Sequence, residues 1–205
     1  YGPEPEDVFY YLTLYNENHA MPPMPDGVGD GIEEGLYRWK GAPAGDLGHR
    51  ATVLFSGSAQ GAARAARKEL ASRWGVGVEL WSATSYKRLR EEAMAVERHN
   101  RLHPADAPGT PRVTQLLLGS AGPIVAVTDF MRAVPDQVAR WVPDGRPWTS
   151  LGTDGFGRSD TRDALRRYFE TDMPHVVVAV LAGLASSGEI DASVVADAIA
   201  HYDLD

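Results

Sequence analysis

The chain has 205 residues, no cysteine, and 28 acidic against 20 basic residues, so its formal net charge is -8. These counts exclude a disulfide framework and a cysteine-based zinc site, and the acidic balance argues against a nucleic-acid partner. The longest apolar run, Val176–Leu184, is far too short to span a bilayer. We therefore expect a cytoplasmic protein that binds neither nucleic acid nor membrane.

Two contrasting segments open the chain. Val8–Tyr15 is a continuous β-branched and aromatic run, which is typical of a strand covered on both faces. Three prolines within Met21–Pro25 then exclude a regular helix or a central strand, so this stretch is the best domain boundary in the sequence. Because nothing else in the chain covers the apolar run, we expect a longer polypeptide in which further residues precede Tyr1.

From residue 51 onward, strands and helices alternate. Apolar runs predict strands at 51–55, 76–81, 124–127 and 148–151. Helices are predicted at 59–74, from 84 or 85 to about 100, after a capping Asp129, from 159 or 160, at 174–187 and at 192–202. Gly75 stands where a helix needs a left-handed cap. The alternation predicts an α/β sheet with helices on both faces.

Gly29–Gly31 begins like the thiamine-diphosphate motif, in which an Asp and a later Asn ligate the Mg²⁺ that holds the diphosphate. After Asn18 the next asparagine is Asn100, so the second ligand is missing. We interpret the stretch as a flexible linker.

Gly152–Asp160 is a glycine-rich turn before a helix, a setting in which backbone N–H groups often bind phosphate. Asp154 and Asp160 would repel an anion there, and Ser159 or Asp160 can cap the helix instead. A structural turn, with a subunit contact as one option, is the better interpretation.

His99 and His103 have the helical spacing of two metal ligands. Pro104 ends the helix at the second histidine, and Glu97 would lie on another face, so partial positive charge at a helix C-terminus explains the pair more simply. A small hydrolase is also disfavoured, because the serine of Gly57–Gly61 is one residue out of register for a nucleophile elbow.

Two polar clusters leave alternatives open. Asn16, Glu17, Asn18 and His19 follow a hydrophobic run, and ligands of open α/β sheets bind beyond the carboxyl ends of strands. They form either part of a ligand site or a polar turn. The acidic C-terminal end is either a solvated face or a site for a basic partner. Its candidate docking residues are Asp197, Asp203 and Asp205.

Several segments, in this order, resemble one enzyme family. They are Phe9–Asn18, Met21–Pro25, Ser82–Ser85, Leu102–Pro104, Leu151–Asp160, Gly188–Asp191 and Val195–Ile199. Over essentially its whole length, the chain resembles the C-terminal end of homodimeric bacterial pyruvate dehydrogenases. These are the thiamine-dependent decarboxylating components of the pyruvate dehydrogenase complex.

The resemblance implies a three-layer α/β/α, transketolase C-terminal-like domain at 32–205, with a short, mostly parallel sheet. Residues 1–25 would be the last strand of a preceding pyrimidine-binding domain plus the linker. The full-length enzyme would use thiamine diphosphate and Mg²⁺ to decarboxylate pyruvate and reductively acetylate lipoyl groups. The family's catalytic, cofactor-binding and metal-binding residues have no match in this chain. We therefore expect it to bind no cofactor alone.

The resemblance also suggests what the chain contributes. Asn16, Glu17, Asn18 and His19 match the strand end that faces the substrate channel. The rest would support a homodimer and offer a docking surface to the dihydrolipoamide acyltransferase, which carries lipoyl and basic subunit-binding domains. The alternative is a non-catalytic binding module that uses Asp197, Asp203 and Asp205 to dock such a basic domain.

Overall fold

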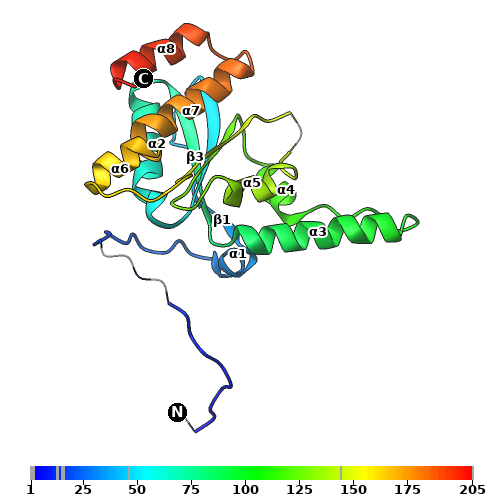
Figure 1. Ribbon diagram of the computed structural model, residues 1–205. Coiled ribbons are helices and arrows are strands. Elements are labelled where there is room, and N and C mark those ends of the chain that lie inside the picture. Colours follow the sequence, from blue (N-terminus) through cyan, green and yellow to red (C-terminus); the bar gives the residue numbers. More distant parts are fainter. Residues whose placement is uncertain (1–2, 13, 15–16, 46, 144, 205) are drawn as a thin grey trace.

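A five-stranded sheet forms the centre of the computed structural model, which describes residues 3–12, 14, 17–45, 47–143 and 145–204 (Figure 1). Its strands are β1 (Leu36–Lys40), β2 (His49–Phe55), β3 (Val76–Ala83), β4 (Ile124–Val127) and β5 (Trp148–Leu151), in the order β1-β3-β2-β4-β5. The strands β3, β2, β4 and β5 are parallel, whereas β1 is antiparallel to β3. The four strands predicted from residue 51 onward are confirmed, and β1 is an additional edge strand.

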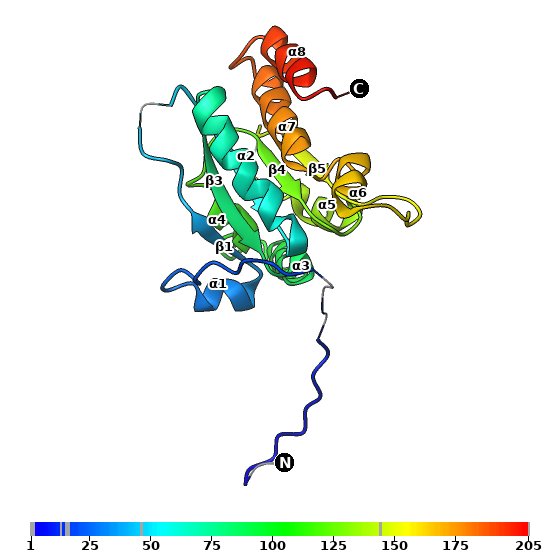
Figure 2. The same ribbon diagram turned by 90° about the vertical axis from the view of Figure 1, so that its left-hand side faces the viewer.

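Alternation along the strands divides the core into two apolar layers. In β2, Val53 and Phe55 point to one face of the sheet and Leu54 points to the other. The first face is covered by α2 (Gln60–Arg73) and α7 (Met173–Ser186), with α8 (Ala192–His201) packed on α7. The second face is covered by α3 (Tyr86–Leu102), α4 (Arg112–Leu117) and α5 (Ala133–Ala139). The three-layer α/β/α fold with helices on both faces is therefore confirmed (Figure 2).

Most of the predicted helices are confirmed, with short shifts at their ends. A 3-10 turn, η1 (Gly57–Ala59), precedes α2, and Gly75 takes the expected left-handed conformation with φ +66°. The side chains of Ser85 and Asp191 cap α3 and α8. The apolar run Val176–Leu184 is part of the buried helix α7.

Two predicted helix caps are wrong. Asp129 does not cap the next helix, because α5 begins four residues later and the Asp129 carboxylate accepts instead from the Ser58 N–H at 3.3 Å. The helix α6 (Arg162–Tyr168) begins after Thr161, whose hydroxyl accepts from the Ala164 N–H. Asp160 accepts from the N–H of Thr161 at 2.7 Å, and it stands one residue before the cap.

The flexible linker predicted around Gly29–Gly31 is also corrected, because Gly29–Glu34 forms the helix α1. Tertiary contacts stabilise this glycine-rich helix. The Thr84 hydroxyl donates to the Ile32 carbonyl at 2.7 Å, and Glu34 forms an ion pair with Arg112.

The apolar run near the N-terminus extends away from the body of the molecule (Figure 1). None of its described residues belongs to a strand, and Phe9 and Leu14 are 92% and 90% exposed. A strand forms only where a neighbouring strand accepts its backbone hydrogen bonds, and no strand among the described residues pairs with this run. Its assignment to the sheet of a preceding domain thus stays a prediction about a longer protein. Within the described chain, no helix combines the length and apolar character that crossing a bilayer requires.

Candidate functional site

A cleft of about 510 Å³ opens at the carboxyl edge of the sheet. The chain leaves β2 through α2 toward β3 on one side, whereas β4 continues toward β5 on the other, so the strand order reverses between β2 and β4. Open α/β sheets bind ligands at such a reversal. Ser58, Thr128, Asp129 and Thr153, which follow the ends of β2, β4 and β5, line this cleft. The fold thus places its cleft where a ligand is expected.

The carboxylate of Asp129 lies at the N-terminal end of η1, the turn that leads into α2. Asp129 Oδ2 accepts from the Ser58 N–H, and a Cβ on Gly57, whose φ is +55°, would lie 2.5 Å from Asp129 Oδ1. Beneath it, the buried hydroxyls of Ser56 and Thr128 share a hydrogen bond of 2.6 Å. The helix N-terminus therefore already interacts with a negative charge, which disfavours an anionic ligand at this point.

Two of the four residues predicted at the strand end line the cleft. Glu17 Oε2 accepts from Arg166 Nη2 at 2.6 Å and lies 3.5 Å from Arg162 Nε and 3.6 Å from His19 Nε2. The hydrogen bond and charge of Arg166 lower the pKa of the Glu17 carboxyl, aided by His19 and Arg162 and opposed by burial. Asn18 is exposed, and Asn16 lies outside the described residues. The structure therefore brings Glu17 and His19 together at the cleft.

Asp172, which no sequence signal indicates, also lines the cleft. It caps α7 by accepting from the His175 N–H at 3.2 Å, and its Oδ1 lies 2.5 Å from His175 Nδ1. Arg167 lies 3.7 Å away. Burial acts to raise the pKa of Asp172, but the hydrogen bonds from His175 and the charges of His175 and Arg167 together lower it below its ordinary value.

The depressed pKa of Asp172 predicts an acid-sensitive stability. A group whose pKa is lower in the folded state stabilises that state above its unfolded pKa, and the effect disappears as pH falls through the folded pKa. We expect Asp172→Ala to cost about 1–2 kcal/mol of unfolding free energy at pH 7. That cost should shrink below about pH 4. Urea unfolding of both proteins from pH 7 to pH 3 measures it, and a cost that stays constant would contradict the assignment.

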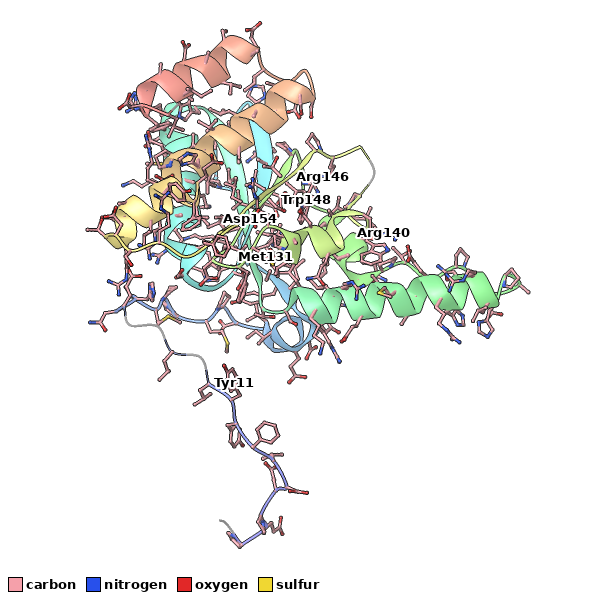
Figure 3. All side chains as sticks on the ribbon, viewed as in Figure 1. Tyr11, Met131, Arg140, Arg146, Trp148 and Asp154 are labelled. Carbon is pink, nitrogen blue, oxygen red and sulfur yellow. The ribbon has the colours of Figure 1, made fainter. Side chains whose placement is uncertain are left out.

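The glycine-rich turn Gly152–Asp160 has the structural role that the sequence favours. Asp154, which is labelled in Figure 3, accepts from the Arg132 N–H at 2.9 Å and from Arg132 Nε at 2.6 Å. These contacts join the loops after β4 and β5. These two hydrogen bonds and the Arg132 charge lower the pKa of Asp154. Since the carboxylate is already paired, it stabilises the turn. Contact of this turn with another subunit stays a prediction.

The remaining candidates lie away from the cleft. The rings of His99 and His103 stack with centroids 4.4 Å apart, and in the described part of the chain no three His, Asp or Glu side chains are grouped as metal ligands. Asp197 and Asp203 are exposed on and after α8, and Asp205 lies outside the described residues.

Comparison with known proteins identifies the domain. The family model of the transketolase-like TK C-terminal domain matches residues 35–172. The chain belongs to this family. It is similar to the pyruvate dehydrogenase E1 component of Mycolicibacterium smegmatis, with 49% identity over 206 residues. The match covers 100% of this chain and 22% of that protein. The Escherichia coli K12 protein of the same name is 44% identical, again over 100% of this chain and 22% of its own length.

The chain thus spans about a fifth of the length of these curated relatives. Among solved structures, transketolase from Leishmania mexicana is 20% identical, with 75% of this chain and 18% of that chain covered and a TM-score of 0.48.

Proposed function

We propose that this chain forms the C-terminal domain of the decarboxylating component of a pyruvate dehydrogenase complex, working as a homodimer in the cytoplasm. The identity of 49% along the entire chain to a protein of that name carries the proposal. In this function the domain supports the dimer and presents Glu17 and His19 at the edge of the substrate channel. The enzyme as a whole decarboxylates pyruvate and reductively acetylates lipoyl groups of the acyltransferase.

Thiamine diphosphate with Mg²⁺ is the cofactor that this function requires, and this chain's residues do not fit it. Mg²⁺ in such a site needs convergent oxygen ligands, and the described residues contain no group of three acidic or histidine side chains that could hold a metal. Asp30, the residue most like a ligand in sequence, lies in the short helix α1. The cofactor would therefore bind to parts of the longer protein outside this chain.

This chain would contribute to the reaction by holding two side chains, Glu17 and His19, in fixed positions. Glu17 is kept ionised by its two arginine neighbours, and its carboxylate lies within 3.6 Å of His19. A fixed carboxylate beside a histidine can orient that side chain. Both residues would thus be held at the channel by the C-terminal domain.

The missing metal ligands predict that the isolated chain binds no thiamine diphosphate. Titration calorimetry with the cofactor and Mg²⁺ should show no heat of binding at concentrations that saturate a thiamine enzyme. Repeating the titration with EDTA provides the control. Micromolar binding that depends on Mg²⁺ would overturn the prediction.

Substrate class separates this proposal from transketolase activity, because the family that matches this chain is described as transketolase-like. A longer protein that ends in this chain should release CO₂ from pyruvate in the presence of thiamine diphosphate and Mg²⁺. It should leave ketose phosphates unchanged. The reverse pattern would refute the proposal.

The exposed acids at the C-terminal end support a second role, docking of the basic subunit-binding domain of the acyltransferase. Reversing the charge of Asp197, Asp203 and Asp205 together should lower the association rate by about tenfold at low salt and much less at high salt. Stopped-flow mixing at two ionic strengths measures this. If neither the rate nor its salt dependence changes, both the docking role and the alternative of a pure binding module fail.

A further inference from the structure

The segment that joins the apolar run to the domain, residues 17–28, crosses the carboxyl edge of the sheet. It begins beside α6, which follows the edge strand β5, and ends at α1, which precedes β1 at the opposite edge (Figure 1). We call residues 17–28 the connecting segment. Its path passes the point between β2 and β4 where the cleft lies, so its placement decides what lies over that cleft.

Glu17, the first residue of the connecting segment, is partly buried against the domain. The next described residue before it, Leu14, is 90% exposed. The contact is made by α6, through Arg166 at 2.6 Å and Arg162 at 3.5 Å. The hydrogen bond from Arg166 spans 149 residues of sequence. Two guanidinium groups on one helix therefore fix the start of the connecting segment.

None of the residues of α6 is buried, but polar contacts tie the helix to the end of α8 and to the start of α7. Arg167, one residue further along, donates to the carbonyl of Tyr202 at 2.7 Å, and its Nη1 lies 3.7 Å from Asp172. The buried Thr171, three residues after the end of the helix, donates its N–H to the Arg166 carbonyl at 2.9 Å. Because these contacts restrain α6, its two arginines can hold Glu17 in one position.

We propose that Arg166 and Arg162 are positioning residues for the pyruvate reaction: they hold Glu17, and with it the polar strand end, at the cleft. The role in the reaction rests on the proposed function, whereas the contact itself concerns this chain alone. A single exposed ion pair contributes little to stability, so the pair of arginines acts on geometry more than on folding. Small displacements of groups at a reaction site lower the rate strongly.

The contact can be tested on this chain without any activity. Because the chain contains no cysteine, Asn18→Cys and Lys68→Cys together give two unique positions for spin labels, one on the connecting segment and one on α2. A narrow distance distribution is expected, and the double change Arg162→Met with Arg166→Met should broaden it. Arg73→Met, which removes an ion pair with Glu69 elsewhere on α2, should leave it narrow. If the distance distribution has the same width in the labelled chain, in its double methionine variant and in its Arg73→Met variant, the proposal is overturned.

The role in the reaction is tested in a longer enzyme that ends in this chain. The double methionine variant should lower kcat for pyruvate by about tenfold. It should change KM by about twofold or less, since ground-state binding is retained. The double lysine variant keeps both charges and should recover most of kcat, which a loss of folding alone would not show. Arg73→Met should behave as the unchanged enzyme.

These outcomes separate the two claims. If the double methionine variant turns over pyruvate with the same kcat as the Arg73→Met control, the positioning role is refuted and the proposed function stands. An unchanged enzyme that does not turn over pyruvate would refute the proposed function, and with it any role in that reaction. The spin-label widths would still decide whether α6 holds the connecting segment.

Discussion

Gly122→Ala should destabilise the domain by about 3 kcal/mol or more, the largest effect expected of any change from glycine to alanine among the described residues. Gly122 has φ +67°, and a Cβ there would overlap the backbone carbonyl of Arg50 at the start of β2. The residue next to it matters for the sheet, because the Pro123 carbonyl accepts from the Thr52 N–H at 2.9 Å. Neither backbone can shift without breaking the β2–β4 pairing.

Gly75→Ala is the matched control for that substitution. Gly75 has nearly the same φ, +66°, but nothing lies within 4 Å of the position its Cβ would take. Gly75→Ala should therefore lower the free energy of unfolding by about 1 kcal/mol, the cost of placing alanine in the left-handed conformation. Urea unfolding of both variants measures the difference, and equal losses would show that the overlap with Arg50 is relieved without cost.

Arg146→Met should lower the free energy of unfolding by about 3 kcal/mol. The guanidinium of Arg146 lies at the amino end of the sheet (Figure 3) and makes five hydrogen bonds of 2.6–3.1 Å. The acceptors are the carbonyls of Leu117, Ala121 and Gly122 and the hydroxyls of Thr52 and Ser120. Because Thr52 is fully buried, methionine would leave polar groups without this partner inside the protein.

Arg140→Met provides the comparison for Arg146. Arg140 also hydrogen-bonds, to Glu97 at 2.9 Å, but its side chain is 68% exposed, so water can replace the contact. Its loss should cost less than about 1 kcal/mol. Denaturant unfolding with unchanged m-values would assign both differences to stability. A smaller loss for Arg146 than for Arg140 would contradict the structural role of the buried guanidinium.

The inner parallel strands β2, β3 and β4 could be predicted from the sequence because side chains on both of their faces are buried. Ile124–Val127 is a continuous apolar run and has the predicted bounds. Trp148–Leu151 also has the predicted bounds, although only Leu151 is buried in it. The edge strand β1 could not be found in this way. Leu36–Lys40 contains two charged residues and is fully buried only at Leu36, so its strand pairing depends on β3, which lies far along the chain.

The candidate site was only partly predictable for a similar reason. Glu17 and His19 follow an apolar run and stand out as polar residues at its end. Arg166 and Asp172 have no such signal, because arginines and an acidic helix cap are common on solvated helices. Only the folded chain brings Arg166 to Glu17, and a pairing across 149 residues leaves no local pattern to recognise.

A chimera tests the central claim most directly. This chain replaces the corresponding 206 residues of the M. smegmatis pyruvate dehydrogenase E1 component, to which it is 49% identical, and pyruvate-dependent reduction of an artificial electron acceptor is measured. We expect the chimera to fold, to bind thiamine diphosphate and to oxidise pyruvate at a rate within about tenfold of the unchanged enzyme. A folded chimera that binds the cofactor but leaves pyruvate unchanged would contradict the account.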